Sequence, residues 1–141
     1  MFDIRLIRTE PDRVKEAMAR RRAGVDIDAV LDTDAKRRTA IYDMEQLRAR
    51  QNRAGESIAA RKRSGENADD VIAEMKSIKE SITVLEEQSR ALDEALQQQL
   101  LILPNIPDST VPEGANDGSN REERTWGVLP VFDFCPRDHV D

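Results

Sequence analysis

The sequence predicts an all-α protein. We expect a long antiparallel two-helix coiled-coil hairpin, with one or two short N-terminal helices before it and an extended C-terminal linker after it. Apolar residues recur at alternating steps of three and four over residues 28–103, which is the pattern of a heptad seam. Residues 63–67 (RSGEN) interrupt this pattern near its middle, and a turn this short joins helices that run antiparallel.

The composition suits long helices that are bathed in solvent. Of the 141 residues, 38% are hydrophobic, 4% aromatic and 35% charged, which is too polar for a globule with a thick core. No apolar run approaches the length of a membrane span, and the N-terminus lacks a signal-peptide pattern. The single Cys135 cannot form an internal disulfide. We therefore expect a cytoplasmic protein that makes no membrane contact.

The residues before the hairpin predict short helices. Asp3 can cap a first turn, and Thr9 is the expected N-cap of the next helix, with Pro11 in its first turn. That helix is expected to end at three arginines, residues 20–22, followed by Gly24. The arginines are interpreted as a solvated helix end, with an RNA contact as the alternative.

The hairpin has a defined expected register. The first long helix begins at a cap supplied by Asp26 or Asp28 and ends near residue 62, and the second begins near residue 68. Gly55 costs about 1 kcal/mol relative to Ala in a helix interior, so the outer half should be the looser one. The turn places Arg61 opposite Val71. The layers that follow are Ile58 with Met75, Ala54 with Ile78, Gln51 with Ile82, Leu47 with Leu85, Met44 with Ser89, Ala40 with Leu92, and Arg37 with Leu96.

The character of the chain changes after the second long helix. Pro104 and Pro107 end that helix, and several turn-forming segments follow. Short strands are conceivable at residues 124–126 and 132–134, but this tail holds too little apolar material to fold alone. We divide the chain into a helical domain over residues 1–103, with its arm at about 28–103, and a linker over residues 104–141. The linker is expected to lead into a catalytic domain that is absent from this chain.

Residues suited to catalysis are scarce. The only histidine, His139, lies near the only cysteine, Cys135, and a dyad of the two is the alternative to an ordinary polar linker. The six glycines are scattered singly, so no glycine-rich phosphate loop is present, and no metal-ligand spacing appears. We predict no catalytic residue and no metal site in this chain.

Basic residues gather in the outer half of the hairpin. Residues 48–63 hold six bases and one acid, whereas residues 69–100 hold eight acids and three bases, two of which lie in the outer half. Phosphate contacts supply much of the affinity of RNA-binding proteins, so this asymmetry predicts RNA binding. The alternative is a structural or protein-interaction coiled coil whose charges are merely solvated. The candidate RNA-binding residues are Arg48, Arg50, Arg53, Arg61, Lys62, Arg63, Lys76 and Lys79.

Motifs at both ends of the chain indicate a known family. The N-terminal motif comprises MFDIRLIR at residues 1–8, Glu10, Pro11 and VKEA at residues 14–17. The C-terminal motif comprises LPNIP at residues 103–107, Val111, Pro112, Gly114, Asn120, Glu122, Arg124, Trp126, Gly127, FDF at residues 132–134, Pro136, Asp138 and His139. In this order they resemble the start and the interdomain linker of bacterial seryl-tRNA synthetase.

The resemblance implies a function for the hairpin. In that family the coiled-coil arm reaches the long variable arm and the elbow of serine tRNA and leaves the anticodon unread. The resemblance also implies that the parent protein is a serine–tRNA ligase, an aminoacyl-tRNA synthetase that acts as a homodimer. ATP and Mg²⁺ would be used by its catalytic domain, with no cofactor bound by this chain. Selenocysteine tRNA is a second candidate partner.

One family pattern in the arm is only partly kept. The pattern Arg-Asn-x-x-Ser-Lys-x-Ile corresponds to QNRAGESI at residues 51–58. Asn52 and Ile58 match it, whereas Gln51, Gly55 and Glu56 depart from it. The resemblance therefore adds Asn52 to the candidate RNA-binding residues.

Overall fold

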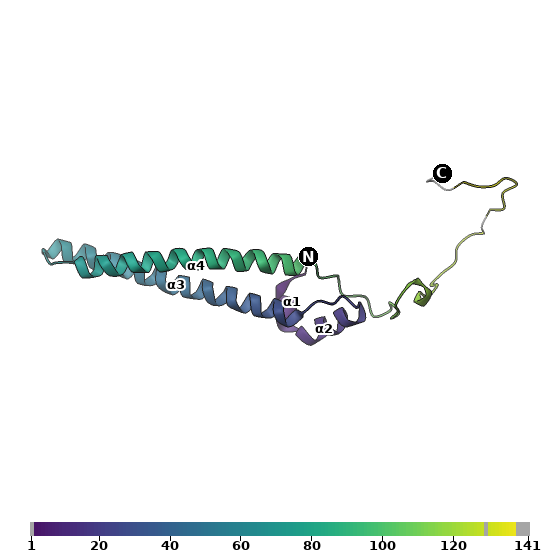
Figure 1. Ribbon diagram of the computed structural model, residues 1–141, viewed down its shortest axis with the longest axis horizontal. Helices are drawn as coiled ribbons and strands as arrows, with labels where there is room; N and C mark the ends of the chain where they lie inside the picture. The colour runs from purple at the N-terminus through teal and green to yellow at the C-terminus, as the bar shows by residue number, and fades with distance from the viewer. Residues whose placement is uncertain (1, 129, 138–141) are drawn as a thin grey trace. The chain divides into compact units, whose positions relative to one another are not determined.

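The computed structural model describes residues 2–128 and 130–137, and these residues form helices and irregular segments with no strand. The all-α prediction is confirmed, and the two long helices lie side by side as an antiparallel hairpin (Figure 1). The two strands considered in the tail are not formed; there, the rings of Phe132 and Phe134 pack at a centroid distance of 5.1 Å. The helices are α1 (Ile4–Thr9), α2 (Pro11–Arg20), α3 (Ile27–Ser64), α4 (Asp69–Leu101) and the 3₁₀ helix η1 (Asp117–Ser119).

The chain divides after Pro107 into two compact units. The first unit contains α1 to α4, and the second contains η1 and otherwise irregular segments. Our division at residues 103 and 104 is one of function rather than of packing, and it stays a prediction. No helix among the described residues is long and apolar enough to cross a membrane.

Helix α1 begins as expected, but α2 does not. The carboxylate of Asp3 accepts a hydrogen bond from the backbone N–H of Arg5 at 2.8 Å. Thr9 is not the N-cap of α2, because it still belongs to the last turn of α1, where its hydroxyl donates to the carbonyl of Arg5 at 3.1 Å. The N-cap is Glu10, which makes no side-chain capping bond, and Pro11 follows at the first helical position.

The C-terminus of α2 uses an arginine where a glycine is usual. Arg22 has a φ of 51°, in the left-handed region, and its N–H bonds to the carbonyl of Ala19 at 2.9 Å. The next N–H, of Ala23, bonds to the carbonyl of Met18 at 3.0 Å, which completes a Schellman arrangement. Gly24, which the sequence indicated for this role, lies two residues too late.

The ends of the long helices follow from local side chains. The carboxylate of Asp26 caps α3 by accepting from the backbone N–H groups of Asp28 and Ala29. At the far end, Gly65 has a φ of 74°, and the N–H of the following residue bonds back to the carbonyl of Arg61. Asn67 then accepts from the first N–H of α4 at 2.7 Å. Each device satisfies backbone groups that a helix end leaves open.

The predicted heptad seam is confirmed by burial. Every predicted seam position is buried or half-buried in the structure. Two observations support the register: Arg61 forms an ion pair with Asp70, the neighbour of Val71, and Met44 shares a pocket with Ser89. The remaining layers stay predictions. In α4 the seam positions are Val71, Met75, Ile78, Ile82, Leu85, Ser89, Leu92, Leu96 and Gln99.

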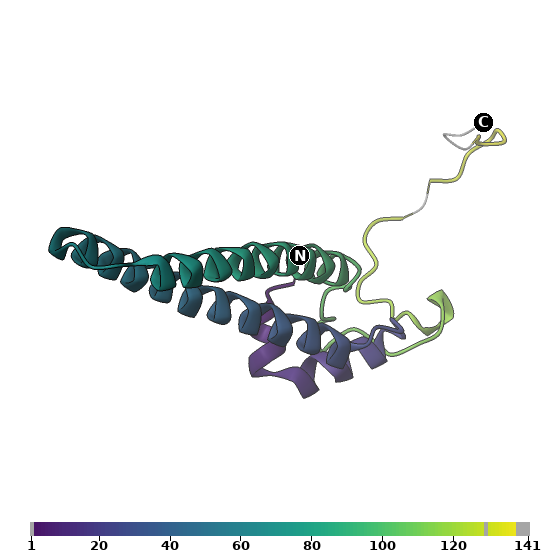
Figure 2. The same cartoon turned by 60° about the vertical axis from the view of Figure 1, so that its left-hand side comes forward.

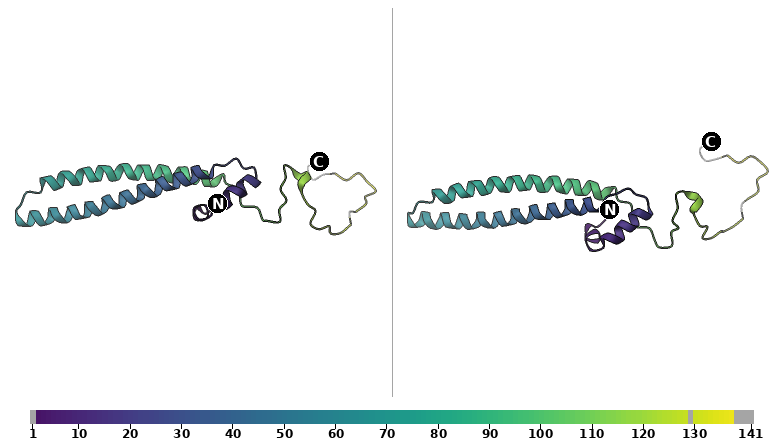
Figure 3. Two further views of the ribbon diagram at one scale, coloured as in Figure 1. Left: turned by 90° about the horizontal axis from the view of Figure 1, so that it is seen from below. Right: turned by 60° about the horizontal axis from the view of Figure 1, so that its bottom comes forward.

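The thickest apolar core lies at the root of the hairpin, where α1 and α2 contact α3 (Figures 2 and 3). Arg21 extends this packing by donating from Nη1 to the carbonyl of Asn105 at 2.7 Å. Among the described residues, Asp34 is the only buried charged side chain, and it is bound by Arg8 of α1. The core residues are Phe2, Ile7, Val14, Ala17, Met18, Ile27, Val30, Leu96, Leu100 and Leu103.

Candidate nucleic-acid interface

The predicted RNA-binding residues lie around the outer end of the hairpin. All nine are exposed except Arg61, which is half-buried in the seam. Residues 48–80 hold eight bases and six acids, a net charge of +2, whereas residues 28–47 and 81–103 together hold four bases and nine acids, a net charge of −5. The outer half is therefore the part of the hairpin that attracts a polyanion.

Three of the predicted arginines are not free, which the sequence did not indicate. Because these pairs are exposed, each contributes at most about 1 kcal/mol to stability, so a phosphate can replace the carboxylate. The hydrogen bond from Arg61 holds the pKa of Asp70 below its usual value. The pairs are Arg48 Nη2 with Glu86 Oε1 at 2.7 Å, Arg50 Nη2 with Glu74 Oε1 at 2.8 Å, and Arg61 Nη1 with Asp70 Oδ1 at 2.7 Å.

The other predicted cations make no ion pair with any described residue. Among them only Arg63 donates a side-chain hydrogen bond to a described residue, from Nε to the carbonyl of Ala59 at 3.2 Å. Lysine ammonium groups present compact positive charge, and guanidinium groups can bind phosphate with two parallel hydrogen bonds. The unpaired predicted cations are Arg53, Lys62, Arg63, Lys76 and Lys79.

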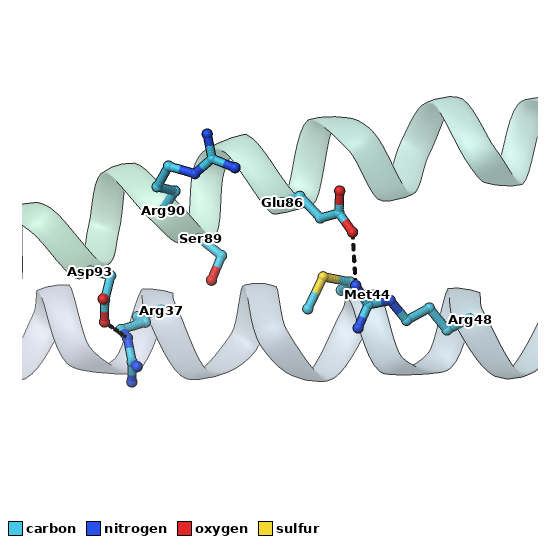
Figure 4. A pocket seen from close by; sticks show the side chains of 7 residues that line it. All are labelled: Arg37, Met44, Arg48, Glu86, Ser89, Arg90 and Asp93. Carbon is cyan, nitrogen blue, oxygen red and sulfur yellow. Dashed lines mark hydrogen bonds and ion pairs between the residues drawn. The ribbon is translucent and has the colours of Figure 1, made fainter.

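An open pocket of about 470 Å³ lies on one side of the seam, with Met44 and Ser89 between its two flanking ion pairs (Figure 4). One pair is Arg48 with Glu86, and the other is Arg37 with Asp93, whose Nε to Oδ1 distance is 2.6 Å. Arg90, which the sequence analysis missed, also lines this pocket, and it makes no ion pair with a described residue. The sequence analysis selected cations in the outer half of the hairpin, and Arg90 lies beyond residue 80, in the acidic part of α4.

A second open pocket, of about 530 Å³, lies nearer the turn. It holds the other two ion pairs, Arg50 with Glu74 and Arg61 with Asp70, together with the unpaired Arg53. Ala54 and Val71 of the seam line it as well. Both pockets are lined by the charged groups that flank the seam.

The first compact unit coincides with a known domain. The family model of the seryl-tRNA synthetase N-terminal domain matches residues 1–107. The chain belongs to this family. The resemblance read from the two ends of the sequence is thereby confirmed.

The relatives that this chain matches carry the name serine–tRNA ligase. It is 36% identical over 141 residues to the ligase of Desulfitobacterium hafniense strain Y51, which covers 100% of this chain and 34% of that protein. It is also 36% identical over 139 residues to the ligase of Oleidesulfovibrio alaskensis, covering 99% of this chain and 33% of that protein. The chain thus spans about a third of the length of these relatives.

A solved structure shows the same fold. The chain superposes with a TM-score of 0.84 and 32% identity on the seryl-tRNA synthetase from Pyrococcus horikoshii, crystallised in complex with ATP. The match covers 90% of this chain and 29% of that one. In the present chain, the described residues contain no group of three or more His, Cys, Asp or Glu side chains placed to hold a metal ion. Cys135 is exposed, and His139, the other half of the conceivable dyad, lies outside the described residues.

Proposed function

We propose that this chain is the tRNA-binding arm of a serine–tRNA ligase, which attaches serine to serine tRNA with ATP. The observation that carries the proposal is the long hairpin with unpaired cations at its outer end, in a chain of the seryl-tRNA synthetase N-terminal family. Helix α3 has 38 residues and so extends about 57 Å at 1.5 Å per residue. This length suits a rod that lies along a duplex distant from the catalytic domain.

The chemistry of the outer end fits duplex RNA. The major groove of A-form RNA is too narrow for side chains to read, so proteins recognise the duplex through its shape, its phosphates and its 2′-hydroxyls. Exposed groups such as Lys76, Lys79 and Lys62 can donate to phosphates, and Asn52 can both donate and accept. In a serine tRNA, the long variable arm and the elbow are the duplex surfaces that such an arm would meet.

The proposal extends to the parent protein. The relatives carry the name serine–tRNA ligase, and the solved neighbour is described as bound to ATP. We propose that the parent enzyme uses ATP and Mg²⁺ in a catalytic domain outside this chain, which itself binds no cofactor; the ATP complex of the solved relative supports the ATP part of this proposal. We also propose a homodimeric cytoplasmic enzyme, with selenocysteine tRNA as a second partner.

The experiment is a binding titration of the 141-residue chain with serine tRNA at 50 to 200 mM salt. Two control RNAs are the same tRNA without its long variable arm and a tRNA with a naturally short one. We expect binding that weakens with salt as phosphate contacts require, and a loss of at least about tenfold without the variable arm. Equal affinity for all three RNAs, or no binding at 50 mM salt, would contradict the proposal. Self-association that rises with concentration, without RNA retention, would favour the structural coiled coil.

A further inference from the structure

The two pockets flank the seam on opposite sides. Arg48 lines one pocket and Arg50 lines the other, and residues two apart are about 200° apart around a helix. The same spacing separates Glu74 of the second pocket from Lys76. Because residues seven apart share one side of a coiled coil, the cations of the outer half can be assigned to these two sides.

One side carries the lysines. Lys62 lies two heptads after Arg48, and Lys76 lies two heptads before Arg90. Lys79 lies one heptad before Glu86, which forms an ion pair with Arg48. We call this side the lysine face, and between residues 41 and 90 its charged residues are Glu45, Arg48, Lys62, Asp69, Lys76, Lys79, Glu86 and Arg90.

The other side is nearly neutralised. We call it the ion-paired face, and between residues 41 and 90 its charged residues are Asp43, which lies one heptad before Arg50, and those of the second pocket, Arg50, Arg53, Arg61, Asp70 and Glu74. Two of its three arginines are already paired with Glu74 and Asp70, and with Asp43 counted the net charge of this face is zero. The lysine face has five cations and three carboxylates, a net charge of +2, and four of those cations make no ion pair with a described residue.

We infer that the lysine face docks the sugar–phosphate backbone of duplex RNA, whereas the ion-paired face is turned away from it. The argument is electrostatic. A phosphate that approaches the ion-paired face meets one unpaired cation, Arg53, and must displace carboxylates from the other two, whereas a phosphate that approaches the lysine face meets four unpaired cations. On α4 the cations from Lys76 to Arg90 span 14 residues, or about 21 Å, which is room for several successive phosphates.

This inference rests on the proposed function and refines it. It adds Arg90 to the nine candidate residues and separates them by face. It assigns Arg50 and Arg61 of the second pocket chiefly to the ion pairs that join α3 and α4. Lysine, with its compact and mobile charge, suits contacts to backbone phosphates that need no fixed geometry.

Two triple variants with the same loss of charge test it. K76Q/K79Q/R90Q changes the lysine face, and R50Q/R53Q/R61Q changes the ion-paired face. Both are measured as 141-residue chains for binding to serine tRNA over a range of salt. For K76Q/K79Q/R90Q we expect a loss of at least about thirtyfold at 100 mM salt, with the slope of log K against log salt shallower by roughly two to three. For R50Q/R53Q/R61Q we expect a loss below about threefold.

Losses of equal size, or a larger loss from R50Q/R53Q/R61Q, would overturn the face assignment while tRNA binding by the unchanged chain still stood. A chain that binds no tRNA at all would overturn the proposed function and this inference together. The circular dichroism melt of each variant reports whether the helices are intact. Because R50Q/R53Q/R61Q also removes two ion pairs, D70N/E74Q provides a second test that leaves all cations in place. A gain in RNA affinity above about fivefold in D70N/E74Q would show that RNA lies on the ion-paired face and would also overturn the assignment.

Discussion

Asp34 of α3 is completely buried, and Arg8 of α1 binds both oxygens of its carboxylate, with Nε to Oδ2 and Nη2 to Oδ1 each at 2.6 Å. Arg38 approaches the same carboxylate at 3.2 Å. Bidentate arginine–carboxylate pairs are among the stronger polar contacts in proteins, and they fix orientation as well as distance. This contact ties the first helix of the chain to the root of the arm.

Breaking this pair should destabilise the domain. Arg8→Met leaves the buried carboxylate with Arg38 alone, and we expect a loss of about 3 kcal/mol in the free energy of unfolding. Since the damage comes from an unpaired buried charge, adding Asp34→Asn should restore much of that loss. Urea denaturation followed by circular dichroism gives the double-mutant cycle. Additive effects of the two substitutions would show that the residues are not coupled.

The pair of Arg8 with Asp34 should make the free energy of unfolding depend on pH. Burial alone would raise the pKa of Asp34, but the hydrogen bonds and charge of Arg8, with the charges of Arg38 and Arg37, outweigh burial and lower this pKa from 3.8. The folded state therefore binds the proton less readily than the unfolded state. This stabilisation is fully present above the ordinary pKa and is lost as the pH falls through the folded value.

Unfolding free energies measured between pH 7 and pH 3 test this dependence. The advantage of the unchanged chain over Asp34→Asn should be constant down to about pH 5 and shrink below it. An advantage that stays the same at pH 3 would indicate that the pKa of Asp34 is not lowered.

Gly55→Ala should stabilise the arm by about 1 kcal/mol, because alanine loses less backbone entropy in a helix interior. A Cβ at residue 55 would lie 3.5 Å from Cε of Met75, an ordinary van der Waals contact, so nothing has to move. The thermal midpoint of the domain should rise. A lower midpoint would mean that the two helices lie too close together at Gly55 to accept a Cβ atom.

Arg22→Gly should also stabilise the domain, by roughly 0.5–1 kcal/mol, because it relieves a left-handed conformation that costs a side chain about 1–2 kcal/mol. Gly65→Ala at the tip of the hairpin is the matched control of opposite sign, since Gly65 has a φ of 74°. Guanidinium denaturation of both variants measures the pair. Stabilisation by both substitutions, or by neither, would contradict the backbone argument.

Much of the fold could be predicted from local sequence patterns. The heptad seam, the Asp26 cap and the turn at Gly65 depend on residues close in sequence, so periodicity and capping preferences were sufficient to find them. The prediction that Thr9 caps α2 was wrong because α1 continues through Thr9. The pair of Arg8 with Asp34 joins residues 26 apart on elements whose mutual orientation no local pattern indicates.

The candidate site, like the fold, was predicted only in part from the sequence. Charge counts located the outer half, and heptad phase already separates Lys76 from Glu74. The sequence could not show which arginines are already paired, because flexible side chains choose among several carboxylates. The pair of Arg50 with Glu74 runs diagonally across the seam and follows no simple register rule.

The contact between Arg8 and Asp34 also fixes the angle at which the arm leaves the root of the hairpin. Helix α3 projects about 45 Å from residue 34 to its end, so a rotation of only 5° at this contact would carry the tip sideways by about 4 Å. A shift of that size exceeds the length of a hydrogen bond. Under the proposed function, the direction in which the arm points at RNA would then be governed by two side chains that are not among the candidate RNA-binding residues.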